Sequence, residues 1–123
     1  VAKEAGCDAV KFQKRSVDLV YAKEVLDAPR ESPWGTTNRE QKLGLELGHK
    51  EYLQIDDYCK KLEIEWLASA WDQKSQKYLK MFNLKYNKIA SAMIVDTDFL
   101  REVAKCQQPQ LPDAAAGTAR ASC

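Results

Sequence analysis

Two lysine residues stand in short, otherwise apolar segments, and each is followed closely by a side chain that forms hydrogen bonds. Lys11 precedes Gln13, and Lys88 precedes Ser91. If both segments are parallel β-strands, each lysine lies near the carboxyl end, which is the edge where open sheets and barrels bind ligands. Two ammonium groups at that edge would bind one anion, such as a phosphate or a carboxylate. The alternative is that both lysines lie on an ordinary exposed edge.

A third apolar segment, residues 64–70, carries Ser69 near its end. Its scarcity of polar residues predicts a strand that is covered on both faces. Ser69 would add a hydroxyl group to the same site, although a small packing residue is an equally good interpretation. Trp71 follows this strand directly and would then border the site.

The other reactive side chains form no recognisable site. His49 is the only histidine, and no neighbouring residue offers the spacing of a metal ligand. The four cysteines form no C-x-x-C pair, so we expect free thiols in a cytosolic protein, with Cys7 and Cys59 buried as small apolar residues. No glycine-rich phosphate loop, nucleophile elbow or Cys/His pair is present.

The acidic and aromatic residues of the middle segment have structural interpretations. Asp56 and Asp57 would be solvated charges on the flank of a helix. The aromatic residues occur at strand and helix spacing, which predicts core packing. They are Tyr58, Trp66, Trp71, Tyr78 and Phe82.

Strands and helices alternate along the chain. The expected strands are 8–13, 64–70 and 86–91, and the expected helices are 38–47, 50–62, a helix capped by Asp72 and a helix capped by Asp96 or Thr97. Val1–Ala5 would be the last turn of a further helix that ends at Gly6. Lys14–Thr37 is expected to be a loop with one helical turn around Lys23–Leu26. This order predicts an α/β fold with a parallel sheet.

The size and composition exclude several classes of protein. The chain has 123 residues, 45 % hydrophobic content and a net charge of +1. A balanced charge argues against a nucleic-acid partner, because such binding needs a surplus of cations. No apolar run is long enough to cross a membrane. Three strands cannot close a barrel, so the chain is expected to be part of a larger α/β fold.

The last eighteen residues, 106–123, break the pattern. They include Pro109, Pro112 and three consecutive alanines, and no strand is expected where the next one is due. We therefore expect two parts: a partial α/β domain over 1–105 and a disordered tail over 106–123. The tail would be either a solvated extension or the product of a changed reading frame or splice pattern after Lys105.

Several separated motifs together resemble the sialic acid synthase (N-acetylneuraminate synthase) family. They are Val10-Lys11-Phe12-Gln13-Lys14, Glu31-Ser32-Pro33-Trp34-Gly35-Thr36, Leu45-Glu46-Leu47 and Asn87-Lys88-Ile89-Ala90-Ser91. The resemblance runs from Val1 to about Lys105. It implies a fragment, about the second to fourth strands with their helices, of a (β/α)8 TIM barrel.

The resemblance also implies an activity. Family members condense phosphoenolpyruvate with N-acetylmannosamine, or its 6-phosphate, to give a sialic acid and phosphate. The enol carbon attacks the sugar aldehyde, and phosphate leaves by C–O cleavage. A divalent metal, Mn2+ or Mg2+, polarises the aldehyde. A cytoplasmic homodimer is implied for the full-length protein.

The resemblance assigns roles to individual residues. Lys11 and Lys88 would be catalytic, and phosphoenolpyruvate would bind to Lys11, Gln13, Ser69, Lys88 and Ser91. The family's catalytic glutamate and metal-binding histidines match nothing in this chain, so we expect no metal site within it and no activity from it alone. Ser91 is followed by alanine and methionine, where many relatives carry glycine and an acid that contacts the sugar.

Three alternatives stay open at this point. A legionaminic or pseudaminic acid synthase would differ only in the amino sugar that it accepts. A non-catalytic interaction product would be a truncated half barrel that pairs with something else. A phosphosugar-binding module of another barrel family would bind a sugar phosphate at the two lysines.

Overall fold

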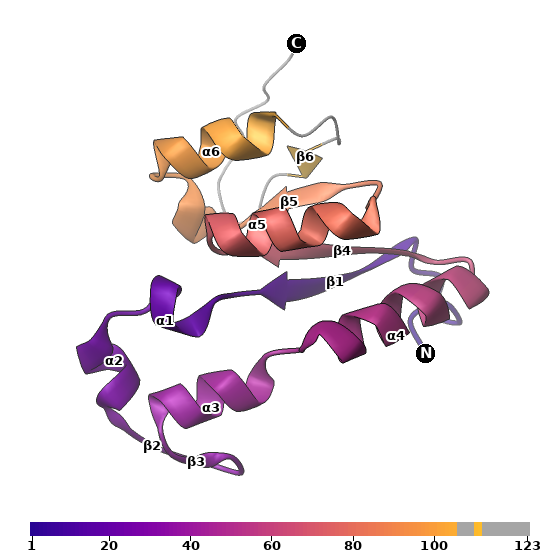
Figure 1. Cartoon of the computed structure of the whole chain (residues 1–123). Coiled ribbons are helices and arrows are strands. Elements are labelled where there is room, and N and C mark those ends of the chain that lie inside the picture. Colours follow the sequence, from indigo (N-terminus) through magenta and orange to yellow (C-terminus); the bar gives the residue numbers. More distant parts are fainter. Residues whose placement is uncertain (106–109, 112–123) are drawn as a thin grey trace.

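The computed structural model describes residues 1–105 and 110–111 (Figure 1). The strands are β1 (Ala9–Lys14), β2 (Pro29–Ser32), β3 (Gly35–Thr37), β4 (Glu65–Ala70), β5 (Asn87–Ile89) and β6 (Gln110–Leu111). The α-helices are α1 (Val17–Val20), α2 (Lys23–Asp27), α3 (Asn38–Leu45), α4 (His49–Lys61), α5 (Gln73–Leu79) and α6 (Thr97–Ala104). Two 3-10 turns, η1 (Lys80–Phe82) and η2 (Ser91–Met93), follow α5 and β5.

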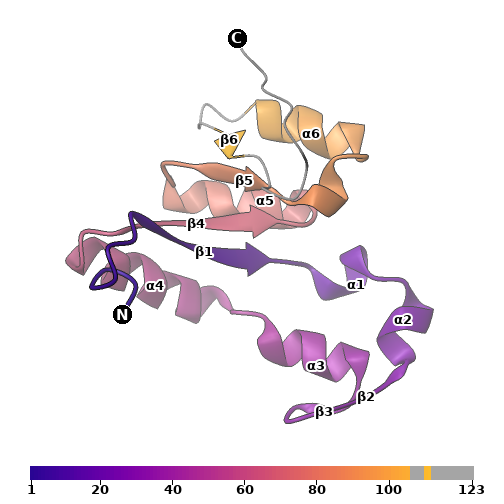
Figure 2. The ribbon, with the colours of Figure 1, turned by 180° about the vertical axis from the view of Figure 1, so that it is seen from behind.

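The main sheet is parallel and has the strand order β1-β4-β5-β6. This confirms the predicted α/β class with a parallel sheet. Helices α4, α5 and α6 contribute to one core on one face of the sheet. Figure 2 looks onto the opposite face, which no helix among residues 1–105 covers. The carboxyl ends of β1, β4 and β5 all point toward α1 (Figure 1).

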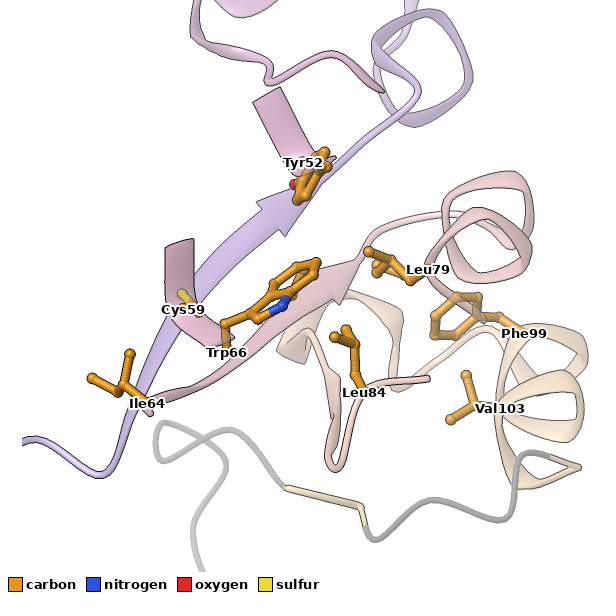
Figure 3. Close-up of a cluster of buried hydrophobic side chains, with 10 residues drawn as sticks. Tyr52, Cys59, Ile64, Trp66, Leu79, Leu84, Phe99 and Val103 are labelled. Carbon is orange, nitrogen blue, oxygen red and sulfur yellow. The ribbon is translucent and has the colours of Figure 1, made fainter. Parts of the chain in front are cut away.

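Strand β4 is buried on both faces, as its apolar sequence predicted. Trp66, Ala68 and Ala70 pack into the helix-side core, together with Leu79, Phe99 and Val103 from α5 and α6 (Figure 3). The alternating residues Leu67 and Ser69 point to the other face and are only 4 % and 1 % exposed.

A cluster of aromatic rings joins α4 to the sheet, and Tyr52 is at its centre. Tyr52 is fully buried and stacks on Trp66 with 5.7 Å between ring centroids. It also contacts the rings of Tyr78 and Phe82. Its hydroxyl donates a 2.8 Å hydrogen bond to the carbonyl oxygen of Gln13. One side chain therefore supports both the core and the end of β1.

The predicted core packing of Tyr58 in α4 is wrong. Tyr58, which the sequence placed in the core, is 62 % exposed, and Leu53 is 50 % exposed. The buried residues of the helix are Tyr52 and Cys59, seven residues apart and thus on one side. Tyr52, whose hydroxyl has a partner in β1, takes the central position instead.

The capping residues that the sequence predicted are present at the ends of the helices. Asp72 accepts a hydrogen bond from the Ser75 amide, and Asp96 accepts one from the Phe99 amide. The amides of Gly6 and Cys7 bond back to the carbonyls of Lys3 and Ala2, with Gly6 at φ +82°. That pattern is the glycine-terminated end expected for a helical turn.

The segment between β1 and α3 is more ordered than a loop. The expected turn is present as α2, but α1 and the β2–β3 hairpin were not predicted. The hairpin rests on α3, since a Cβ at Gly44 would collide with the Trp34 ring. Thr37 and Glu40 form a reciprocal capping box at the start of α3.

The expectation that no strand follows Lys105 is wrong. Gln110 and Leu111 form β6 and pair in parallel with Asn87 and Lys88. The edge of β5 offers backbone groups for this pairing. A strand of two residues between two prolines has no pattern in the sequence that would predict it. Residues 106–109 and 112–123 lie outside the described residues, so the expected disorder of the tail stays a prediction. Among the helices that are described, none is long and apolar enough to cross a membrane.

Replacing Tyr52 tests the role of the aromatic cluster. We expect Tyr52→Ala to lower the free energy of unfolding by about 3–5 kcal/mol, because it leaves a cavity. Tyr52→Phe removes only the bond to Gln13 and should cost about 1–2 kcal/mol. The matched control on the same helix is Tyr58→Ala, whose cost should stay within about 0.5 kcal/mol. Equal losses for the two alanine variants in urea unfolding followed by circular dichroism would contradict this packing.

Candidate active site

The strand register places three of the predicted site residues in one row. Gln13 pairs with Ser69 across β1 and β4, and Ser69 pairs with Lys88 across β4 and β5. Residues in register on parallel strands share a face, so the three side chains lie on the face without helices. Adjacent strands are about 4.8 Å apart, which puts the row within the span of a small ligand.

Lys11 lies on the same face of the sheet, further from the carboxyl ends of the strands. It pairs with Leu67 and lies two residues before Gln13, about 7 Å along the strand. Ser91 lies beyond the end of β5, in the turn η2. The register therefore brings Lys11, Gln13, Ser69 and Lys88 to one surface, with Ser91 at its edge. Their roles in binding and catalysis stay predictions.

Ser69 is the buried centre of the row. Its side chain is 1 % exposed, and its Oγ atom has no hydrogen-bond partner among the described residues. A buried hydroxyl without a partner is uncommon in folded proteins. Lys88 beside it is half-buried, with its Nζ 3.5 Å from the Ile89 carbonyl oxygen. Lys11 and Gln13 are exposed.

Directly after β1, Arg15 connects three other segments. Its Nε donates to Glu46 Oε1 at 2.5 Å, and its backbone amide donates to Glu46 Oε2 at 3.2 Å. Its Nη1 donates to the Tyr21 hydroxyl at 3.0 Å, and its guanidinium lies 5.9 Å from the centre of the Trp71 ring. The two charged side chains are only 14 % and 11 % exposed, so removing either one leaves a poorly solvated charge.

Asp72 holds Ser16, the residue that follows Arg15, in place. Its carboxylate accepts hydrogen bonds from the Ser16 amide at 2.7 Å and the Ser16 hydroxyl at 3.1 Å, besides capping α5. Burial alone would raise the pKa of Asp72, but the hydrogen bonds from Ser16 and Ser75 outweigh it and hold the pKa below the ordinary value. Asp72 thus locks the exit of β1 to the exit of β4.

A hollow of about 610 Å³ lies beside β1 and includes Lys14, His49 and Tyr78 in its lining. Lys14 pairs with Ala70, on the helix side of the sheet, and donates to the Leu47 carbonyl at 3.3 Å. Its ammonium group lies over the Tyr52 and Tyr78 rings. This lysine therefore has a structural role and does not belong to the row.

The residues that the structure describes do not form a metal site. Among residues 1–105 and 110–111, no three His, Cys, Asp or Glu side chains come together in a way that could hold one. His49 Nδ1 lies 3.0 Å from the Tyr78 hydroxyl, a contact within the fold. Asp56 is also structural, because it accepts a 3.0 Å hydrogen bond from Trp66 Nε1. The expectation that Asp56 is merely solvated is therefore wrong.

The cysteine predictions have a mixed outcome. Cys59 is buried, as expected, and burial raises the pKa of its thiol. Cys7 is exposed, contrary to expectation, because it follows the turn at Gly6 outside the sheet. Both are free thiols. Cys106 and Cys123 lie outside the described residues.

Sequence reasoning missed the residues that hold the site in place. Arg15, Glu46 and Tyr52 were given no role, although they position the end of β1. Glu46 lies between two leucines, and an isolated carboxylate in an apolar setting is a sign of a buried partner. No local pattern identifies that partner as Arg15.

Comparison with known proteins agrees with the motif resemblance. The model of the NeuB family matches residues 1–116, beyond Lys105. The chain belongs to the NeuB family. It is 34 % identical over 110 residues to the N-acetylneuraminate-9-phosphate synthase of Drosophila melanogaster, covering 88 % of this chain and 30 % of that protein.

Other relatives extend the range of named products. The human N-acetylneuraminate-9-phosphate synthase is 30 % identical over 113 residues, covering 90 % of this chain and 32 % of that protein. An N,N'-diacetyllegionaminic acid synthase of Legionella pneumophila is 31 % identical over 114 residues, covering 90 % and 31 %. The chain thus spans less than a third of the length of these NeuB relatives.

The lowered pKa of Asp72 predicts a pH-dependent stability. Its folded-state pKa lies below the unfolded value of about 3.9, so the carboxylate stabilises the fold above that pH. This stabilisation is lost as the pH falls through the folded-state pKa. At pH 7 we expect Asp72→Asn to lower the free energy of unfolding by about 1–2 kcal/mol.

The difference between Asp72→Asn and the unmodified chain should shrink as the pH falls below 4, measured by urea unfolding at each pH. The control Asp57→Asn changes an exposed carboxylate of α4 and should cost no more than about 0.5 kcal/mol at pH 7. A difference for Asp72→Asn that stays constant from pH 7 to pH 2 would contradict the assignment.

Proposed function

We propose that this chain supplies the phosphoenolpyruvate-binding part of a synthase that joins phosphoenolpyruvate to N-acetylmannosamine, or to its 6-phosphate. The products are an N-acetylneuraminate-type sialic acid, or its 9-phosphate, and inorganic phosphate. The observation that carries the proposal is the register that aligns Gln13, Ser69 and Lys88 on one face, with Lys11 beside them. Membership of the NeuB family supports the reaction class.

The chemistry of the ligand matches the charges of this surface. Phosphoenolpyruvate has a phosphate and a carboxylate, and Lys11 and Lys88 supply two ammonium groups to offset them. Ser69 Oγ and the Gln13 amide donate hydrogen bonds that fix its orientation, with Ser91 at the outer edge. Because Ser69 and part of Lys88 are shielded from water, these interactions are stronger than at an open surface.

The fold that best accommodates this site is a TIM barrel. In this proposal β1, β4 and β5 are the second, third and fourth barrel strands, and β6 follows β5 as the next strand does in a barrel. The face without helices would then be the barrel interior, where side chains of neighbouring strands lie in layers. In this proposal residues 1–105 belong to the barrel domain, and the NeuB family match over residues 1–116 supports this assignment.

The proposal extends to the complete protein. A divalent metal would act as a Lewis acid there, with ligands from outside this chain, so the chain alone should be inactive. We further propose a cytoplasmic homodimer. Neither a nucleic acid nor a membrane is a partner in this account.

The test is a phosphate-release assay on the complete gene product with phosphoenolpyruvate, N-acetylmannosamine and Mn2+. We expect Lys11→Ala and Lys88→Ala each to lower kcat/KM by about 10²–10³-fold, as loss of an electrostatic donor does elsewhere. The control is Lys61→Ala, which removes an exposed ammonium group from the far end of α4 and should leave the rate unchanged. No phosphate release, or equal rates for all three variants, would overturn the proposal.

A legionaminic acid synthase is the second candidate, because a relative with that product is 31 % identical to this chain. The same assay separates the two when the amino sugar precursor of legionaminic acid replaces N-acetylmannosamine. The acceptor with the higher kcat/KM identifies the product.

A further inference from the structure

The Gln13 carbonyl lies on the outer edge of the main sheet. β1 is the first strand in the sheet order, so only one of its edges pairs with β4. The Trp71 amide donates to the Lys14 carbonyl at 3.1 Å, so the Lys14 carbonyl points toward the β4 side. Backbone carbonyls alternate between the two edges of a strand. The Gln13 carbonyl, one residue earlier, therefore points to the outer edge.

Tyr52 reaches this edge from the helix side of the sheet. Figure 3 shows its ring beside the end of β1, and its hydroxyl donates to the Gln13 carbonyl at 2.8 Å. The ring stacks on Trp66, and its centre lies 5.8 Å and 6.1 Å from the centres of the Tyr78 and Phe82 rings. Because Tyr52 is fully buried among these rings, it has no room to turn. Its hydroxyl is a fixed anchor for the carboxyl end of β1.

The Tyr52 hydroxyl is a donor at every working pH. Burial raises the pKa of Tyr52 above its usual range, and the nearby Glu46 carboxylate raises it further. The hydroxyl therefore keeps its proton, and the bond to the Gln13 carbonyl does not depend on pH.

This bond acts on the peptide group that Gln13 shares with Lys14. The peptide group is planar, so fixing its carbonyl oxygen fixes the backbone angle ψ of Gln13. The side chain of Gln13 is exposed, so no packing sets its direction, although the backbone pairs with Ser69. An exposed glutamine loses rotamer entropy when it binds a ligand, and a fixed backbone beneath it lowers the disorder that binding must remove.

We propose that Tyr52 is a positioning residue for phosphoenolpyruvate. It touches no substrate, but by holding the Gln13 carbonyl it directs the Gln13 amide along the row of Gln13, Ser69 and Lys88. This inference rests on the proposed function and assigns the site a supporting residue from the opposite side of the sheet.

The first test is Tyr52→Phe in the complete gene product, assayed by phosphate release. The ring stays, but the hydroxyl is removed. We expect the KM for phosphoenolpyruvate to rise about threefold to tenfold, as for one lost hydrogen bond. The kcat and the KM for N-acetylmannosamine should change by less than about twofold. The matched control is Tyr78→Phe, which removes the hydroxyl that lies 3.0 Å from His49 Nδ1 and should alter none of these values.

The second test repeats Tyr52→Phe in the Gln13→Ala background. The carbonyl at position 13 and its bond to Tyr52 remain there, but the side chain to be positioned is gone. We expect Tyr52→Phe to change the KM for phosphoenolpyruvate by less than about twofold in this background. A purely structural effect would raise the KM by the same factor in both backgrounds and would overturn the inference.

Phe82→Leu keeps the inference testable if Tyr52→Phe does not fold, as checked by circular dichroism. Phe82 is half-buried and contacts the Tyr52 ring, so a smaller side chain loosens the anchor but leaves the hydroxyl. We expect the KM for phosphoenolpyruvate to rise about twofold to threefold with Gln13 present and to stay constant in Gln13→Ala. No rise with Gln13 present, or the same rise in both, would count against the inference.

The outcomes separate the two claims. If the unmodified protein releases phosphate and Tyr52→Phe leaves the KM for phosphoenolpyruvate unchanged, the inference about Tyr52 is wrong and the proposed function stands. No phosphate release from the unmodified protein overturns both.

Discussion

The unbroken parallel pairing of β1 with β4 is the constraint on which the rest of the structure depends. It runs from Ala9 and Glu65 to Lys14 and Ala70. A slip of one residue would turn Lys11 and Gln13 into the helix-side core and expose Phe12 on the other face. The aromatic cluster prevents this slip, because Trp66 and Tyr52 require apolar neighbours from β1, and the Tyr52 hydroxyl is bonded to the Gln13 carbonyl. The core thus sets the position of the candidate site.

Hydrogen bonds to two carboxylates hold the segment that leaves β1 against neighbouring parts of the chain. Arg15 and Ser16 follow β1 directly, and each bonds to a carboxylate from a different part of the chain, Glu46 or Asp72. The α3–α4 connection and the start of α5 are therefore held against the end of β1.

Much of this could be predicted from local sequence. The strand β1, the apolar run of β4 and the capping residues Asp72 and Asp96 depend only on neighbouring residues, and all were confirmed. The missed features depend on distant partners. Tyr52 is 39 residues from Gln13, and Arg15 is 31 from Glu46. β6 likewise forms only because the edge of β5 is already in place. Neither hydrophobic periodicity nor residue propensity encodes such distant pairings. For this reason Tyr58 was predicted to be the buried tyrosine of α4, whereas the buried one is Tyr52.

The central claim is that Lys11, Ser69 and Lys88 form one anion-binding surface on the face of the sheet without helices. A crystal structure of the complete gene product with phosphoenolpyruvate tests this most directly. The account predicts phosphate and carboxylate oxygens within about 3.2 Å of Lys11 Nζ, Lys88 Nζ and Ser69 Oγ. Phosphoenolpyruvate bound on the helix side of the sheet, at Lys14 and His49, with no contact to these three atoms, would contradict it.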